Sequence, residues 1–196
     1  MNNSLKYFNY LKTRSNLGRL YRKYWLYPTL VRYLKGSTLD IGCGIGDMLA
    51  FKASSTGVDI NPHTVDYCKA LGFNAYLMQP DQLSFPDKHF DSVLLDNVLE
   101  HIENPNQLLQ EIGRVLRDDG SLLIGIPGTR GWLSDPDHKV NYDEQGLKLC
   151  LSNAGYNCIK IFYTPLWRSS FLSKRMRLYC MYACFALESP SPIVSN

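Results

Sequence analysis

The stretch "LDIGCGIGDML" at residues 39–49 combines three glycines with apolar residues and two aspartates. Residues 38–41 have the composition of a short buried strand, and residues 47–51 that of the first turn of a helix. Glycine permits a tight turn between two such elements, and the free N–H groups at a helix N-terminus can face a polar ligand. The stretch therefore predicts a strand, a glycine turn and a helix that together cradle a ligand.

Strand-like and helix-like segments alternate along the rest of the chain. With 38–41, the pattern predicts seven strands, the others covering residues 54–60, 73–78, 90–97, 121–127, 157–163 and 176–188. The turn into the strand at 121–127 is expected at residues 118–120. Such alternation predicts an α/β fold in which helices cover both faces of a parallel sheet. Only a loop is expected between the last two strands, so the final strand should run antiparallel at or near an edge.

Helix ends can be predicted from capping residues. Asn61 is a suitable N-cap with Pro62 at the first helical position, and Gly72 suits the end of that helix. Asn104 is the expected cap of a later amphipathic helix. Asn141 and Glu144 have the spacing of a capping box for another helix, which is expected to end near Gly155.

The glycine spacing argues against a dinucleotide as the ligand. The dinucleotide fingerprint G-x-G-x-x-G would need glycine at position 47, where the chain has Asp47. A carboxylate at that helix start would repel a pyrophosphate, and a second acid, Asp40, precedes the first glycine. An acidic turn suits a ligand that carries an ammonium and a sulfonium. A dinucleotide-binding oxidoreductase is therefore the less favoured alternative.

Four fragments occur in a characteristic order: "LDIGCGIGDML", "GVDIN", "FDSVLLDNVLEHI" and "RVLRDDGSLLIGIPG". Together they resemble the motifs of the class I S-adenosylmethionine-dependent methyltransferases, and the likeness extends from about Leu39 to Gly155. It implies a Rossmann-like, doubly wound, mostly parallel seven-stranded sheet with an antiparallel last strand. It also implies S-adenosylmethionine as cofactor and direct in-line methyl transfer to oxygen or nitrogen. The alternative within this fold is a non-catalytic, cofactor-binding partner of another enzyme.

The same resemblance divides the chain and assigns residues. Residues 39–188 would form the methyltransferase domain, residues 1–38 a basic, aromatic helical segment that covers the acceptor site, and residues 189–196 a flexible tail. Asp59 would accept hydrogen bonds from the ribose hydroxyls, and Asp40 would orient the ammonium. The adenine amino group would meet either Gln79 or Asp81. The expected cofactor-binding residues are Asp40, Gly42, Cys43, Gly44, Asp59, Ile60, Gln79, Asp81, Asp96 and Asn97.

Two histidines are candidates for chemistry, since both follow strands at the carboxyl edge of the sheet. His138, in "DPDHKVNY", is the first choice for a general base or acceptor-binding residue, with structuring of its loop as the alternative. His101 is expected near the transferred methyl group, or else packs its loop. Some methyltransferases carry an E-x-x-E-H metal site on this segment, but here Asn97 replaces the first carboxylate. No required metal is therefore expected.

Charge is strongly segregated along the chain. Eight Lys or Arg and no acid precede Asp40, seventeen acids oppose seven bases over residues 40–144, and six bases accompany only Glu188 thereafter. Both basic ends contain aromatic residues. This pattern favours an anionic acceptor, either a small molecule bearing phosphate or carboxylate or a lipid-linked glycan reached by peripheral membrane contact. Nucleic acid is disfavoured because no recognition motif accompanies the charge.

Composition places few further limits on function. The chain has 196 residues, of which 45% are hydrophobic and 20% charged, as expected for one globular domain. The six cysteines show no metal-binding spacing. No apolar stretch has the length of a membrane span, and the first residues lack the apolar core of a signal peptide, so a cytoplasmic location is expected. These features leave the oligomeric state unpredicted.

Overall fold

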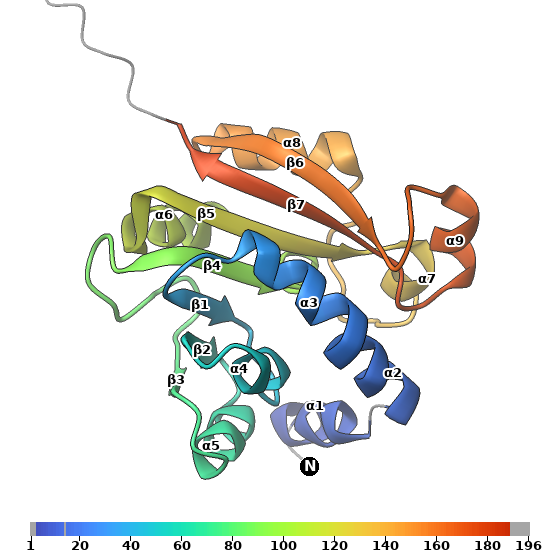
Figure 1. Ribbon diagram of the computed structural model, residues 1–196, viewed down its shortest axis with the longest axis horizontal. Coiled ribbons are helices and arrows are strands. Elements are labelled where there is room, and N and C mark those ends of the chain that lie inside the picture. Colours follow the sequence, from blue (N-terminus) through green and yellow to red (C-terminus); the bar gives the residue numbers. More distant parts are fainter. Residues whose placement is uncertain (1–2, 14, 189–196) are drawn as a thin grey trace, which may run out of the picture.

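The computed structural model describes residues 3–13 and 15–188, so the expected tail at 189–196 lies outside the described residues. Seven strands in the described part form one sheet in the order β3-β2-β1-β4-β5-β7-β6 (Figure 1). The strands are β1 (Thr38–Ile41), β2 (Ser55–Asp59), β3 (Ala75–Leu77), β4 (Phe90–Asp96), β5 (Leu116–Pro127), β6 (Tyr156–Thr164) and β7 (Cys180–Leu187).

Strand directions confirm the predicted α/β class. The pairs β1–β2, β2–β3, β1–β4 and β4–β5 are parallel, whereas β7 is antiparallel to both β5 and β6. The last strand is thus antiparallel, as expected, and it lies between β5 and the edge strand β6. The order reverses at β1, so β1 and β4 form the switch point at whose carboxyl ends ligands bind in such folds.

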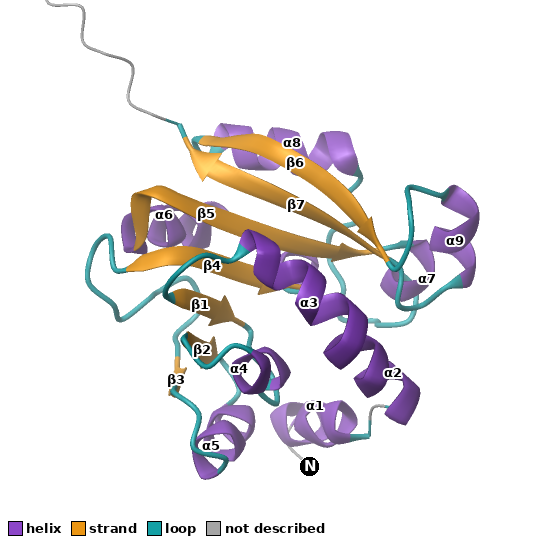
Figure 2. Ribbon diagram, viewed as in Figure 1, coloured by secondary structure: helices purple, strands orange, loops and turns teal. Residues whose placement is uncertain are grey.

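Helices lie on both faces of the sheet, with α6 and α8 behind it and α3 and α4 in front in the view of Figure 2. The α-helices are α1 (Asn3–Lys12), α2 (Asn16–Tyr21), α3 (Tyr27–Leu30), α4 (Asp47–Phe51), α5 (Pro62–Ala70), α6 (Asn106–Val115), α7 (Thr129–Trp132), α8 (Glu144–Asn153) and α9 (Ser170–Arg175). Three further turns are a π-helix, η1 (Arg22–Leu26), and two 3₁₀ turns, η2 (Val31–Tyr33) and η3 (Leu99–His101). Within the described residues, no helix is both long and apolar enough to cross a bilayer.

The period-two alternation of β4 explains how both faces are covered. Val93 and Leu95 belong to the core packed against α6 and α8, whereas Leu94 packs with Leu26 and Leu30 of the N-terminal helices. On α6, apolar residues recur at helical spacing and all are buried: Leu108, Leu109, Ile112 and Val115. The sheet is therefore covered by apolar residues on both faces, and a third, smaller cluster joins Leu49 of α4 to Val65 and Cys68 of α5.

Three helix predictions need correction. The N-cap of α6 is Pro105, although the Asn104 side chain still accepts a hydrogen bond from the Asn106 N–H at 3.3 Å. The N-cap of α8 is Asp143 rather than Asn141, because the Asp143 carboxylate accepts from the Gly146 N–H at 2.7 Å. A short helix, α9, interrupts the connection between β6 and β7, where only a loop was expected. The predicted cap at Asn61 is confirmed by its 3.0 Å bond from the His63 N–H.

The turn expected at residues 118–120 falls inside the bounds of a strand. These residues lie within β5, at an irregularity where Leu116 pairs with Phe90 and Ser121 pairs with Ser92. The chain turns sharply there, because a Cβ atom on Gly120 would lie only 2.7 Å from Cγ of Leu116. The expected turn is therefore present, but β5 already begins before it, at Leu116.

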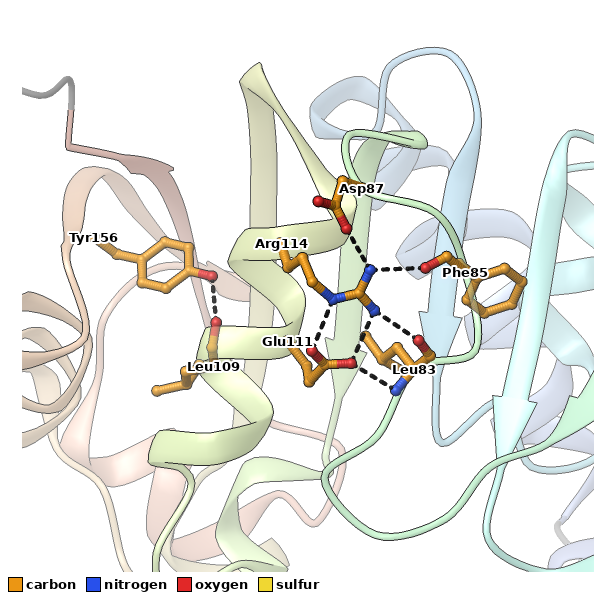
Figure 3. Close-up of polar contacts among 7 residues, drawn as sticks. All are labelled: Leu83, Phe85, Asp87, Leu109, Glu111, Arg114 and Tyr156. Carbon is orange, nitrogen blue, oxygen red and sulfur yellow. Dashed lines mark hydrogen bonds and ion pairs between the residues drawn. The ribbon is translucent and has the colours of Figure 1, made fainter.

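Arg114 of α6 fastens the segment before β4 to the domain (Figure 3). Its guanidinium donates to the backbone carbonyls of Leu83 and Phe85, both at 2.8 Å. It also pairs with Glu111 at 2.8 Å and Asp87 at 2.7 Å. Glu111 in turn accepts from the Leu83 N–H at 3.0 Å. One side chain thus contacts two carbonyls of the segment 83–87, of which that of Leu83 also accepts from the Phe85 N–H at 2.8 Å.

We expect Arg114→Ala to lower the free energy of unfolding by about 1–3 kcal/mol, because the part-buried Phe85 carbonyl and Glu111 carboxylate each lose a donor. Arg117→Ala is the matched control, since its pair with Asp91 is more exposed and such a pair contributes about 0–1 kcal/mol. Urea denaturation followed by circular dichroism measures both changes. Equal losses for the two variants would show that the carbonyl contacts of Arg114 contribute little.

Candidate functional site

A cavity of about 1230 Å³ lies at the carboxyl ends of the parallel strands. In Figure 1 the arrowheads of β1, β4 and β5 point toward the side of the molecule that carries α1, α2 and α7. The cavity walls come from the glycine turn after β1, the ends of β2 and β4, the N-terminal helices and the segments after β5 and before β7. This is the edge of the sheet at which the sequence predicted a ligand.

The turn after β1 has the conformation that its glycines predicted. Gly42 and Gly44 have φ angles of 72° and 55°, in the left-handed region that side chains rarely adopt. A Cβ atom on Gly42 would lie only 2.6 Å from Cγ2 of Val98. Gly42, Cys43 and Gly44 all line the cavity, so the backbone of the turn faces its interior.

Asp59, the last residue of β2, is 7% exposed and lines the cavity beside this turn. Its carboxylate accepts from the Gly44 N–H at 2.9 Å and from the Asn61 N–H at 2.8 Å. Burial raises the pKa of Asp59, and these backbone bonds offset part of that rise. The Thr64 hydroxyl and the Ile60 N–H also act on this carboxylate, so a ligand donor would share its lone pairs with them.

A group of carboxylates gives the same end of the cavity a negative character. Asp40 is 4% exposed, and its pKa lies well above the usual range, because of burial first and then the neighbouring charges of Asp96 and Asp59. Asp96 accepts hydrogen bonds from the Tyr182 hydroxyl at 2.7 Å and from the Asn97 side chain at 2.8 Å. A bound cation would relieve the repulsion among these acids.

The structure brings most of the expected residues to this cavity. Gln79 is the exception: it is exposed, forms an isolated bridge with Gln82 and is not among the lining residues, whereas Asp81 is. Ile60 is 63% exposed, unusual for an apolar side chain beside a cavity. The expected residues that line it are Asp40, Gly42, Cys43, Gly44, Asp59, Ile60, Asp81, Asp96, Asn97, His101 and His138.

His101 and His138 lie side by side although they belong to different segments. Their ring centroids are 4.6 Å apart, and both rings line the cavity. Burial lowers the pKa of His101, and the neighbouring His138 lowers it further. Glu100 lies beneath them, fully buried, and burial raises its pKa to about 8. The His138 Nε2 atom lies 3.7 Å from Glu100 Oε1, beyond hydrogen-bond range.

The two basic ends of the chain meet over the cavity. The Arg177 guanidinium donates to the Tyr10 hydroxyl of α1, and the Trp25 indole N–H donates to the Pro165 carbonyl at 3.0 Å. Leu11 of α1, 2% exposed, comes close to Gly44, within 3.4 Å of where a Cβ would be. The N-terminal helices therefore form one wall of the cavity and reach the glycine turn itself.

Sequence reasoning missed several lining residues. Tyr182 enters from β7, and its contact with Asp96 depends on how β7 inserts into the sheet. Arg22 lines the cavity, whereas its neighbour Lys23 is exposed and lies over the Tyr24 ring. Both belong to the basic N-terminal segment that was expected to cover the acceptor site, and nothing in the local sequence separates them. Glu100 could have been noticed as the acid preceding His101, but its complete burial could not.

Part of this chain is similar in sequence to known methyltransferases. A family model described as "Methyltransferase domain" matches residues 39–124. An uncharacterized protein of Methanocaldococcus jannaschii is 35% identical over 92 residues, which is 47% of this chain and 45% of that protein. A demethylmenaquinone methyltransferase of Tropheryma whipplei is 31% identical over 94 residues, 44% of this chain and 39% of that protein. The matches thus cover less than half of the length of these curated relatives.

The fold itself has relatives among solved structures. One from Archaeoglobus fulgidus, described as a SAM dependent methyltransferase, has a TM-score of 0.70 at 22% identity. The comparison covers 95% of this chain and 100% of that one. The likeness therefore extends beyond the segment matched by sequence and includes the N-terminal helices and the antiparallel strands.

Proposed function

Because residues 39–124 are a methyltransferase domain of the class I S-adenosylmethionine-dependent family, we propose that this protein binds S-adenosylmethionine and methylates an anionic acceptor. The acceptor is a small molecule, a glycan or a lipid-linked compound, methylated on oxygen or nitrogen. One observation carries the proposal. A single cavity is lined by the glycine turn with Asp40 and Asp59 and also by the histidine pair and Arg22.

The residues at the glycine turn fit the proposed cofactor. Asp59 lines the cavity with a carboxylate that can accept from ribose hydroxyls, while its bonds from Gly44 and Asn61 hold the turn in shape. Asp40 and the acids around it favour a ligand with a cationic ammonium and sulfonium. Asp81 lines the cavity where the adenine amino group would lie, and the exposed face of Ile60 offers an apolar surface to the adenine ring.

The cofactor supplies a methyl group on a sulfonium, which is already a good leaving group. The protein then has to align the acceptor with that carbon and exclude water. His101 and His138 line the same cavity as Asp96 and Asn97, where they can contact the acceptor. The N-terminal helices and the segment around Arg177 cover the cavity, which supports the assignment of residues 1–38 to acceptor binding.

The basic residues on the walls are the basis for an anionic acceptor. Arg22, Lys139 and Arg177 line the cavity, whereas Lys23, Lys174 and Arg175 do not. Arg22 is half-buried, so a carboxylate or phosphate beside it would be paired with less competition from water. The acceptor is therefore expected to place its negative group near Arg22.

Calorimetric titration with S-adenosylhomocysteine and with NAD tests the cofactor. We expect S-adenosylhomocysteine to bind one site per chain and NAD to bind none, and tight binding of NAD alone would overturn the proposal. Transfer of labelled methyl groups from S-adenosylmethionine to a panel of acidic and neutral acceptors tests the activity. Cofactor binding without transfer to any acceptor would favour a non-catalytic partner protein.

Charge reversal at Arg22 and at its neighbour Lys23 tests whether the negative group of the acceptor contacts Arg22. Arg22→Glu is expected to raise the KM for the acceptor identified in the panel by at least about tenfold, since a charge-assisted hydrogen bond is lost. Lys23→Glu is the matched control, and its exposed charge should alter KM by no more than about twofold. Steady-state kinetics at low and high salt provide the measurement. Equal changes in KM for the two variants would show that the acceptor responds to the general positive charge of this surface and makes no specific contact with Arg22.

A further inference from the structure

Three potential metal ligands converge where β4 ends. Glu100 and His101 belong to the 3₁₀ turn η3, and His138 comes from the loop after α7. One ligand atom from each of the three residues lies within 4.8 Å of the other two. They meet although His138 lies thirty-seven residues beyond His101 in the sequence. Two backbone bonds hold the loop against the turn, since the Glu100 carbonyl accepts from the N–H groups of Lys139 and Val140 at 2.8 and 3.0 Å.

A backbone carbonyl lies beside the Nδ1 atom of each imidazole ring. The Nδ1 atom of His138 lies 2.7 Å from the Trp132 carbonyl, and that of His101 lies 3.3 Å from the Asp137 carbonyl. A carbonyl oxygen can only accept, so each Nδ1 carries the hydrogen and each Nε2 keeps its lone pair. Metal-bound histidines are typically fixed in this way by a second hydrogen bond.

Glu100 supplies an independent indication. Its side chain is fully buried, and neither carboxylate oxygen has a hydrogen-bond partner among the described residues. A buried carboxyl group without partners is costly, and native proteins rarely leave one so. The nearest nitrogen in the cluster, Nε2 of His138, is 3.7 Å from Glu100 Oε1. Two ligands of one tetrahedral Zn²⁺ lie roughly 3.3 Å apart, so a small closure of this gap would accommodate an ion.

We propose that Glu100, His101 and His138 bind a divalent first-row transition ion, with Zn²⁺ as the type case. Two imidazoles and one carboxylate leave coordination positions open, as in catalytic rather than structural sites. His101 and His138 line the cavity, so an open position would face it and could hold the reacting oxygen or nitrogen of the acceptor. This last role rests on the proposed methyltransferase function, whereas the binding of the ion does not.

The proposal departs from the sequence expectation of no required metal. That expectation rested on Asn97, which stands where a first carboxylate would be needed. In the structure the Asn97 side chain donates to Asp96 instead. The third ligand comes from His138, far along the chain, which pattern matching on one segment does not include.

Cobalt binding tests the site without any need for an acceptor. We would strip the full chain with a chelator, titrate it with Co²⁺ and record the visible absorption that a site of low coordination number produces. We expect one Co²⁺ per chain, displaced by Zn²⁺. Glu100→Gln and His138→Ala should each weaken binding at least about 100-fold, more than the roughly 10–100-fold typical of losing an outer-shell partner. His63→Ala, in α5, is the control and should bind as the parent does.

Several outcomes would overturn the metal site. They are an absence of saturable Co²⁺ binding, equal binding by the parent and Glu100→Gln, or an equal loss in His63→Ala. Thermal melting provides a second readout, because Zn²⁺ should raise the melting temperature of the parent but not of the ligand variants. If Glu100→Gln fails to fold, His101→Ala replaces it. Titration of the stripped protein with S-adenosylhomocysteine separates the two proposals: cofactor binding without metal binding would remove only the metal site.

Discussion

Asp59→Ala is expected to weaken binding of S-adenosylhomocysteine by about 2–4 kcal/mol, or roughly 30-fold or more, on the scale of hydrogen bonds to charged groups. The loss has two sources. The ribose hydroxyls would lose their acceptor, and the N–H groups of Gly44 and Asn61 would lose the carboxylate that holds the turn at 2.9 and 2.8 Å. Both sources act on the same ligand, so the effect on affinity should exceed that of any single cofactor contact.

Two further variants make this test specific. Asp59→Asn keeps one acceptor oxygen but replaces the other with a donor, so it should show an intermediate loss. Asp66→Ala removes an exposed acid from the neighbouring helix α5 and should leave the affinity unchanged. Calorimetry measures the affinities, and circular dichroism verifies the fold of each variant. An affinity of Asp59→Ala within threefold of the parent would remove Asp59 from the cofactor site.

Gly42→Ala is expected to lower the free energy of unfolding by about 2–4 kcal/mol, with loss of cofactor affinity as well. Part of the cost comes from the φ angle of 72°, which disfavours any side chain by about 1–2 kcal/mol. The rest comes from overlap, since the new Cβ would lie 2.6 Å from Cγ2 of Val98 and overpacking costs about 1–3 kcal/mol. Val98 is β-branched, so its side chain has few alternative rotamers with which to avoid the contact.

The chain offers controls that separate these two costs. Gly72 has a φ angle of 82° and nothing within 4 Å of its Cβ position, so Gly72→Ala should show the backbone cost alone. Adding Val98→Ala to Gly42→Ala should recover the overlap cost, which a double-mutant cycle on urea unfolding would report as coupling. If Gly42→Ala lowers the free energy of unfolding no more than Gly72→Ala does, the contact with Val98 does not contribute to the loss.

The parts of the fold that depend on neighbouring residues were predictable from the sequence. The glycine turn between β1 and α4 follows from residues within one short stretch, since positive φ angles at Gly42, Gly44 and Gly46 are a local backbone property. The apolar periodicity of α6 and the cap at Asn61 are local in the same sense. Errors arose where two local solutions were equally good, as at Asn141 and Asp143, both suitable caps. Packing of the helix then decided between them.

The sequence by itself determined that parallel strands would carry the glycine turn, Asp59, Asp96 and both histidines to one edge of the sheet. That result follows from the order and period of the elements, because every parallel strand ends on the same side. Only the tertiary structure decided which side chains meet there. Insertion of β7 between β5 and β6 places Tyr182 on Asp96, across 86 positions of sequence. Folding of the loop after α7 joins His138 to Glu100 and His101. The rotation between successive helical residues separates Arg22, which lines the cavity, from Lys23, which does not. Such contacts depend on strand order, register and burial, which arise only when the whole sheet packs, so no short stretch of sequence contains them.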